Sequence, residues 1–213
     1  ANGNATGETN GKVYGVVAGN SKYIDVNKDG KINTEDQGII GCGQPTFNWG
    51  WNNTFNYKNF DFSFFVVGFH GFDIYNATHQ MGYNLIKSQQ MAGVTPMREL
   101  LNRWTPTNTN TDIPGFVKGG TENKDFFSTR FVENGSFIKM KSITLGYTLP
   151  EATCRSLGIN NLRVYASVQN PFHITKYSGL DPEATMGSPL VQGVDWGAYP
   201  NSRNYLIGLN FSF

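Results

Sequence analysis

This sequence of 213 residues has little of several features that would assign a function at once. It contains only two cysteines, three histidines and 15% charged residues, with a formal net charge of +1. So weak a charge excludes the strong basic field typical of nucleic-acid-binding proteins. Cys42 and Cys154 fit no metal or redox spacing, and His70, His79 and His173 form no ligand motif.

Long hydrophobic runs are also missing, and the mean hydropathy is −0.38. No stretch approaches 18 uninterrupted apolar residues, so the sequence predicts no transmembrane helix. It holds no nucleophile elbow, phosphate-binding loop or Rossmann fingerprint, and Asp112, Glu122, Asp125 and Glu133 show no spacing typical of a catalytic carboxylate pair. We therefore predict that the chain is not an enzyme. No initiating Met or signal peptide is present, which indicates a fragment or a processed product.

Aromatic residues, at 14%, are abundant and alternate with polar ones from Thr46 onward. This period of two predicts a strand over 46–57, a turn at Lys58-Asn59 and a second strand over 60–75. Further strands are predicted at about 129–149, 162–169 and 204–213. In the first of these the apolar parity changes, which predicts a β-bulge near Lys141-Ser142.

The connections between these strands alternate between short and long. The long ones are residues 76–127, where a short helix is predicted with Thr95 as N-cap and an apolar face ending at Trp104, and residues 177–202. An antiparallel meander would then have its short turns at one end and its long loops at the other, as outer-membrane barrels do. The fold class predicted is all-β, a segment of an antiparallel transmembrane β-barrel. A soluble β-sandwich, which also alternates, is the alternative.

A barrel of this kind determines on which side of the membrane each loop lies. Loops 1–45, 76–127 and 177–202 would be extracellular, the C-terminus periplasmic, and residues 46–213 the barrel strands with their loops. Cys42 and Cys154 would lie near opposite rims and remain free thiols, because the apolar band of about 25 Å exceeds the reach of a disulfide. Five strands cannot close a barrel, so other sequence or other chains would supply the rest.

Residues 25–36 have the pattern of a calcium loop. Asp25, Asn27 and Asp29 occupy alternate ligand positions, Lys31 would offer its backbone carbonyl, and Asp36 would close the site. Gly30 stands where the sharp turn needs a residue without Cβ. The pattern predicts a structural calcium ion, and the competing interpretation is a surface loop whose Asp and Asn side chains cap its own turns.

These features occur together with a series of motifs that resembles the C-terminal part of the SusC/RagA family of TonB-linked outer-membrane transporters. The motifs follow one another in order over residues 23–213, and are Asp25-x-Asn27-x-Asp29-Gly30-x-Ile32, Ile40-Gly41, Pro45-x-Phe47-x-x-Gly50, Tyr57-Lys58-Asn59-Phe60-Asp61, Arg103-Trp104-Thr105-Pro106, Arg130 to Phe137, Leu145 to Pro150, Val168 to Phe172, Tyr177 to Glu183 and Arg203 to Phe213.

The resemblance implies that this chain forms the last five strands of a barrel of about 22 strands. It implies import of glycans or oligopeptides, powered through the TonB complex by way of an N-terminal part that lies outside this sequence. A SusD-like surface lipoprotein would cover the extracellular mouth, and membrane lipids would surround the strands. Gly208, Phe211 and Phe213 would form the β-signal read by the barrel-assembly machinery. The alternative function is that of a secreted, calcium-stabilised carbohydrate-binding β-sandwich module.

Overall fold

The computed structural model describes residues 6–9, 12–15, 19, 21, 23–83, 96–115, 127–186 and 192–213. The chain divides into two compact units, one formed by residues 1–40 and 76–132 and the other by residues 41–75 and 133–213. The second unit holds the long strands and is described first. No helix among the described residues is long and apolar enough to cross a membrane.

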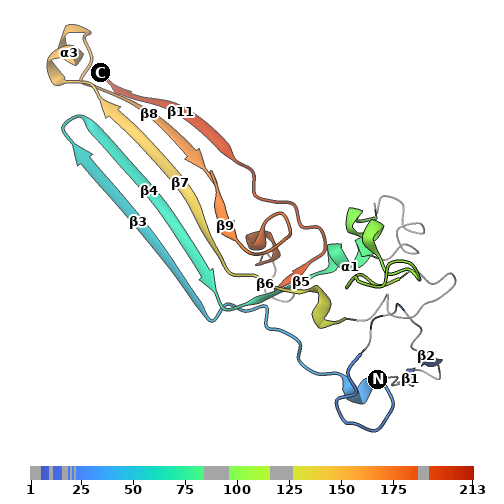
Figure 1. Cartoon of the computed structure of the whole chain (residues 1–213). Coiled ribbons are helices and arrows are strands. Elements are labelled where there is room, and N and C mark those ends of the chain that lie inside the picture. Colours follow the sequence, from blue (N-terminus) through green and yellow to red (C-terminus); the bar gives the residue numbers. More distant parts are fainter. Residues whose placement is uncertain are drawn as a thin grey trace. The chain divides into compact units, whose positions relative to one another are not determined.

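Five long antiparallel strands form the main sheet of the second unit (Figure 1). Each strand pairs with the next long strand of the chain, as predicted for a meander, in the order β11-β8-β7-β4-β3. They have 9 to 12 residues, which is longer than the five or six common in soluble sheets. Their bounds are β3 Phe47–Tyr57, β4 Phe60–His70, β7 Phe137–Thr148, β8 Asn161–Gln169 and β11 Asn204–Ser212.

The registers of these pairs align the apolar positions of all five strands on one face of the sheet. Trp51 lies opposite Val66, Phe62 opposite Leu145, and Leu145 opposite Ala166, which in turn lies opposite Ile207. This apolar face is open, since Trp51 is 56% and Ile207 85% exposed. A sandwich would instead bury these side chains in a closed core between two sheets, so the sandwich alternative is wrong.

The predicted bulge is confirmed at Lys141. Phe65 of β4 pairs with Ser142, whereas the next residue, Val66, pairs with Met140, so the ladder skips Lys141. The backbone of β7 gains one residue there, and the side chains that follow change face. Lys139 and Lys141 both pair with Glu183, as described below.

The second predicted strand is shorter than expected. It was predicted to continue to Tyr75, but β4 ends at His70 because Gly71 adopts a φ of 73° that breaks the ladder. The segment after it, β5 (Asp73–Asn76), joins a separate small sheet with β6 (Val132–Asn134) and β10 (Val194–Asp195). Similarly, the strand predicted over 129–149 is divided into the 3-10 helix η3 (Thr129–Phe131), β6 and β7.

The two ends of the main sheet differ. One end carries the Lys58-Asn59 turn, the unpredicted helix α3 (Glu151–Ser156) and the end of the chain (Figure 1). The other end carries the small sheet, the short strand β9 (His173–Thr175) and the 3-10 helix η4 (Pro182–Met186). The buried apolar cluster lies at this second end, which we call the loop end, and consists of Val67, Phe72, Ile74, Phe137 and Tyr177.

The described residues of the first unit form short elements only. In place of the predicted N-terminal loop, β1 (Thr6–Thr9) and β2 (Lys12–Gly15) pair antiparallel. The helix predicted to end at Trp104 is a 3-10 helix, η2 (Arg98–Asn102), with no side-chain cap, and its expected N-cap Thr95 lies outside the described residues. The sequence did not predict α1 (Ala77–Tyr83).

Candidate functional sites

The loop predicted to bind calcium, residues 25–36, turns sharply at Gly30, which has a φ of 81°. The Asp25 carboxylate accepts hydrogen bonds from the amides of Asp29 (3.2 Å) and Gly30 (2.8 Å). Asn27 Oδ1 accepts one from the Asp29 amide at 3.0 Å. The ligand side chains therefore bend toward the inside of their own loop, as a cation site and a self-capped turn both require.

The C-terminal end of this loop closes on its beginning. Asp36 Oδ1 accepts a hydrogen bond from the Val26 amide at 2.8 Å, and Oδ2 accepts one from the Asn33 amide at 2.8 Å. Asp36 lies in the 3-10 helix η1 (Thr34–Asp36), and Asn33 caps this helix. The hydrogen bond from the Asn33 amide, together with those from Val26 and Asn27, outweighs the opposing effect of burial and lowers the pKa of Asp36.

The donor set of this loop fits calcium in kind, because it consists of carboxylate, amide and backbone carbonyl oxygens. Among the described residues, however, no group of three or more His, Cys, Asp or Glu side chains is close enough to hold a metal ion. The carboxylates of Asp25, Asp29 and Asp36 instead accept hydrogen bonds from backbone amides of the loop. Calcium binding by this loop therefore stays a prediction.

At the loop end of the second unit, two motifs from distant parts of the sequence meet. Glu133 accepts hydrogen bonds from both the amide and the hydroxyl of Ser178, each at 2.8 Å. Gly135 donates its amide to the Phe72 carbonyl at 2.9 Å and packs so closely on the Phe72 ring that a Cβ would lie 2.4 Å from it. The residues Glu133 to Phe137 and Tyr177 to Glu183 are thus parts of one folded cluster.

Charged side chains fix the last long loop to β7. Lys139 is only 2% exposed, and its Nζ donates to Asp181 Oδ2 at 2.8 Å and to Glu183 Oε2 at 2.7 Å. Lys141 also pairs with Glu183, through Oε1. Asn201 Nδ2 donates to Asp181 at 3.2 Å and to Glu183 at 2.9 Å. We call these five side chains the loop-anchoring cluster; it contains two ammonium groups and two carboxylates.

The pKa values of Asp181 and of the nearby Tyr177 are shifted by their surroundings. Burial acts to raise the pKa of Asp181, but the hydrogen bonds from Lys139, the Asn201 amide and the Glu183 amide outweigh it, so the pKa is lowered. Tyr177 donates its hydroxyl to Asp195 at 2.5 Å, and burial together with this carboxylate raises the pKa of the phenol. At neutral pH, Asp181 is thus ionised and Tyr177 protonated.

On the polar face of the sheet, toward the short-turn end, a salt bridge spans three strands. Arg163 of β8 donates to Asp61 of β4 through Nε at 2.8 Å and through Nη2 at 2.6 Å. Both groups lie over Gly146 of β7, where a Cβ would be 2.3 Å from Asp61 Oδ1 and 2.6 Å from Arg163 Nη2. The glycine therefore makes room for a bidentate pair across the strand between them.

The predicted assembly-signal residues lie in β11 and just beyond it. Gly208 is covered by the Tyr165 ring, since a Cβ there would lie 2.3 Å from Tyr165 Cζ. Phe211 is on the exposed apolar face, and its ring centroid is 6.0 Å from that of Phe213. Their recognition as a signal stays a prediction. Cys42 and Cys154 are both free thiols, as predicted.

The loop-anchoring cluster was not among the predicted sites. A signal was present, because two lysines two residues apart in an aromatic strand are costly unless acidic groups meet them. The acids, Asp181 and Glu183, lie in the Tyr177 to Glu183 motif. The partners are 42 to 44 residues apart in the sequence, so no local spacing pattern could predict their pairing.

Comparison with known proteins extends these observations. The chain is 36% identical over 201 residues to TonB-dependent receptor P3 of Formosa agariphila, covering 92% of this chain and 19% of that protein. It is 32% identical over 193 residues to TonB-dependent receptor SusC of Bacteroides thetaiotaomicron, covering 90% of this chain and 17% of that protein. No protein-family model matches the chain.

Solved structures of related transporters show the same similarity. The chain superposes on a structure of the RagAB peptide transporter with a TM-score of 0.67 at 29% identity, over 80% of this chain and 17% of that one. A structure of the RagAB peptide importer in the "closed-closed" state gives a TM-score of 0.70 at 25% identity, over 97% of this chain and 20% of that one.

The antiparallel meander with one open apolar face, together with these matches, defines a segment of an outer-membrane β-barrel. The resemblance predicted from the motifs is confirmed, and the chain belongs to the SusC/RagA family of TonB-linked transporters. It spans about one fifth of the length of the curated relatives it matches.

Proposed function

We propose that this chain is part of a TonB-dependent importer of glycans or oligopeptides in the outer membrane. The observation that carries the proposal is the open apolar face that continues across all five long strands, in a chain homologous to TonB-dependent receptors. Soluble proteins rarely expose apolar patches of this extent, whereas a barrel presents such a face to lipid.

In this proposal the loop end of the sheet faces the cell exterior and the C-terminus lies in the periplasm. Residues 1–45 form an extracellular segment and residues 46–213 the barrel strands with their loops. A SusD-like lipoprotein covers the extracellular mouth, and the TonB complex acts through parts of the protein outside this chain. The likeness to SusC and to the RagAB complexes supports these partners.

Calcium in the loop 25–36 would be structural. The ion would be held by side-chain oxygens of Asp25, Asn27, Asp29 and Asp36 and by the backbone carbonyl of Lys31, and would tie both ends of the loop together. Among the described residues next to the loop there is no helix like those of a calcium sensor, and η1, which lies within the loop, has three residues. The ion would therefore stabilise the loop rather than switch it.

The experiment begins with the full transporter that contains this chain, expressed in cells with and without TonB. Outer membranes are washed with salt and at high pH, and uptake of labelled oligosaccharides and oligopeptides is measured. The proposal predicts that the protein stays in the membrane until detergent is added and that uptake requires TonB. Release by the high-pH wash, or uptake that is equal without TonB, would contradict it.

A further inference from the structure

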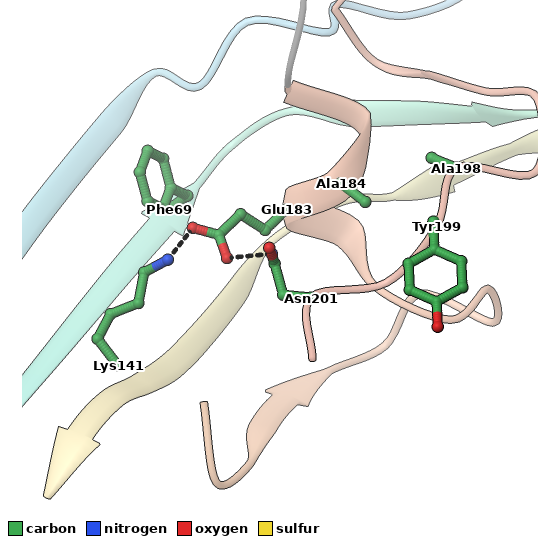
Figure 2. A pocket seen from close by; sticks show the side chains of 7 residues that line it. All are labelled: Phe69, Lys141, Glu183, Ala184, Ala198, Tyr199 and Asn201. Atoms are coloured by element: carbon green, nitrogen blue, oxygen red, sulfur yellow. Dashed lines mark hydrogen bonds and ion pairs between the residues drawn. The ribbon is translucent and has the colours of Figure 1, made fainter. Parts of the chain in front are cut away.

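The two ends of the main sheet are held together by different contacts. At the loop end, Figure 2 shows Glu183 of the last long loop paired with Lys141 of β7, which is a contact between a loop and a strand. Toward the short-turn end, the contacts lie within the sheet and reach β11. This strand lies at the edge of the sheet and, among the described strands, pairs with β8 alone. The register of β11 therefore depends on this one neighbour.

One row of residues crosses the polar face of these strands. Asp61 of β4 lies opposite Gly146 of β7, which lies opposite Tyr165 of β8. Tyr165 in turn lies opposite Gly208 of β11. Gly146 and Gly208 are the only glycines of their strands. Because a glycine inside a strand is unfavourable unless another group needs the space, this row indicates two close contacts.

Side chains of β8 fill the space above both glycines. The Tyr165 ring covers Gly208, which is the only residue of β11 that is not exposed. The Arg163 guanidinium passes over Gly146 and meets the Asp61 carboxylate at 2.8 and 2.6 Å. Cζ of Arg163 also lies 5.0 Å from the centroid of the Tyr165 ring, within the range of a cation–π contact. Asp61, Arg163 and Tyr165 thus link β4 to β11, and we call these three side chains the cross-strand brace.

The alternation of β11 does not define its register completely. A slip of one residue would turn its apolar side chains to the polar face, so the alternation excludes it. A slip of two residues keeps every side chain on its own face, and alternation cannot prevent it. Such a slip would place Leu206 or Asn210 opposite Tyr165, and a side chain would then need the space that the ring occupies. Gly208 alone leaves that space free.

We propose that the Tyr165 ring and Gly208 fix the register of the last strand, and that Arg163 and Asp61 hold the ring over the glycine. A closed barrel requires a fixed stagger between its strands, so a slip of two residues at β11 would prevent correct closure with the rest of the barrel. The predicted assembly signal also includes Gly208. Direct recognition by the assembly machinery would require this glycine even without the ring, whereas the packing role requires it only beneath the ring.

A disulfide cross-link can measure this register in the full transporter. Cys42 and Cys154 are replaced by Ser, and Gln169→Cys and Asn204→Cys then place two thiols at opposite positions of β8 and β11, where the native amide side chains lie 3.4 Å apart. A slip of two residues would separate the thiols by about 7 Å along the strands, beyond the reach of a disulfide. The cross-linked fraction of the protein oxidised in the outer membrane therefore reports the native register.

Gly208→Leu should lower the cross-linked fraction about twofold or more, because the leucine and the Tyr165 ring cannot occupy one space. The addition of Tyr165→Ala to Gly208→Leu should restore the fraction, since the ring is then absent. Ser212→Leu is the matched control, because it adds the same side chain to the same face of β11 at a position opposite Asn161, and it should change nothing. Arg163→Gln removes the support of the ring and should lower the fraction by less than Gly208→Leu.

The inference is overturned if Gly208→Leu keeps the full cross-link, or if adding Tyr165→Ala fails to restore it. A wild-type fraction in Arg163→Gln would overturn the part assigned to Arg163 and Asp61. Should Gly208→Leu leave no protein in the membrane, the amount of inserted protein recovered in the double variant gives the same decision. The cross-link does not depend on uptake, so a failed import test would leave this inference intact.

Discussion

Two acid-rich loops of this chain satisfy their carboxylates in different ways. In residues 25–36, the carboxylates accept backbone amides from no more than ten residues away. In the last long loop, Asp181 and Glu183 meet ammonium groups of Lys139 and Lys141, about 42 residues away in the sequence. The first loop supplies its own partners, and the second is held by a strand.

The difference has an electrostatic consequence. Residues 25–36 contain four acids and two lysines, a formal charge of −2, and none of the ion pairs found in the described residues involves them. Amide dipoles carry only partial charges, so the calcium ion predicted from the sequence would meet a loop of net negative charge. The loop-anchoring cluster already balances two carboxylates with two lysines and needs no metal.

The largest effect is expected from Lys139→Met. Removing the ammonium leaves the buried Asp181 carboxylate without its charged partner, which costs about 3–5 kcal/mol. Hydrogen exchange of the amides in residues 194–202 should become faster. The exposed Lys176 provides the control, since Lys176→Met should leave exchange as in the wild type. Equal exchange in both variants would mean that the cluster does not anchor the loop.

Asp29→Ala tests the other of the two compared loops, residues 25–36. It removes one proposed calcium ligand, so bound calcium should fall, while the barrel still assembles. Calcium at one hundred times its dissociation constant should stabilise the wild-type loop by about 2.7 kcal/mol and the variant by less. Lys31→Ala should keep the ion, because it retains the backbone carbonyl. The calcium content of the purified wild-type and variant transporters is measured by metal analysis. An unchanged calcium content in Asp29→Ala would refute the site.

Acid should release the anchored loop. The folded-state pKa of Asp181 is lower than its ordinary value, so its stabilising contribution is complete above about pH 3.9 and is lost as the pH falls through the folded pKa. Limited proteolysis between pH 6 and pH 3 should therefore cut the loop only below about pH 4. Asp181→Asn should remove this transition. Cleavage that begins between pH 5 and pH 6 in the wild type would contradict the assignment.

The smallest effect is expected at the exposed pair of α3. Arg155 Nη2 lies 2.5 Å from Glu151 Oε1, but both side chains are about three-quarters exposed. Arg155→Ala should change the free energy of unfolding by at most about 1 kcal/mol, because solvent screens the pair. Denaturant unfolding measures this change. A loss of unfolding free energy as large as that of Lys139→Met would show that burial does not explain the difference between the two ion pairs.

Much of the sheet could be predicted because its signal is local. Alternation places Trp49, Trp51 and Phe55 on one face whatever the partner strand is, and the parity change at Lys141 marks the bulge from within one strand. The predicted ends of the strands were less accurate. A single residue, Gly71, ends β4, although the apolar pattern continues beyond it.

The loop-anchoring cluster could not be predicted, since its energy comes from groups that only folding brings together. Two lysines in an aromatic strand indicate that acidic groups meet them, but nothing local identifies Asp181 and Glu183 as those groups. The same holds for Arg163 and Asp61, which are 102 residues apart in sequence. The calcium pattern, in contrast, was visible because its donors lie within twelve consecutive residues.

The central claim is that the open apolar face of the sheet contacts lipid. It is tested most directly by spin labels placed one at a time along β11, at positions 205 to 212, in the full transporter with Cys42 and Cys154 replaced by Ser. We predict an alternation, with labels at Tyr205, Ile207, Leu209 and Phe211 accessible to oxygen in the bilayer and labels between them accessible to a water-soluble relaxation agent. Labels that show no alternation, or that are all accessible from water, would contradict the claim.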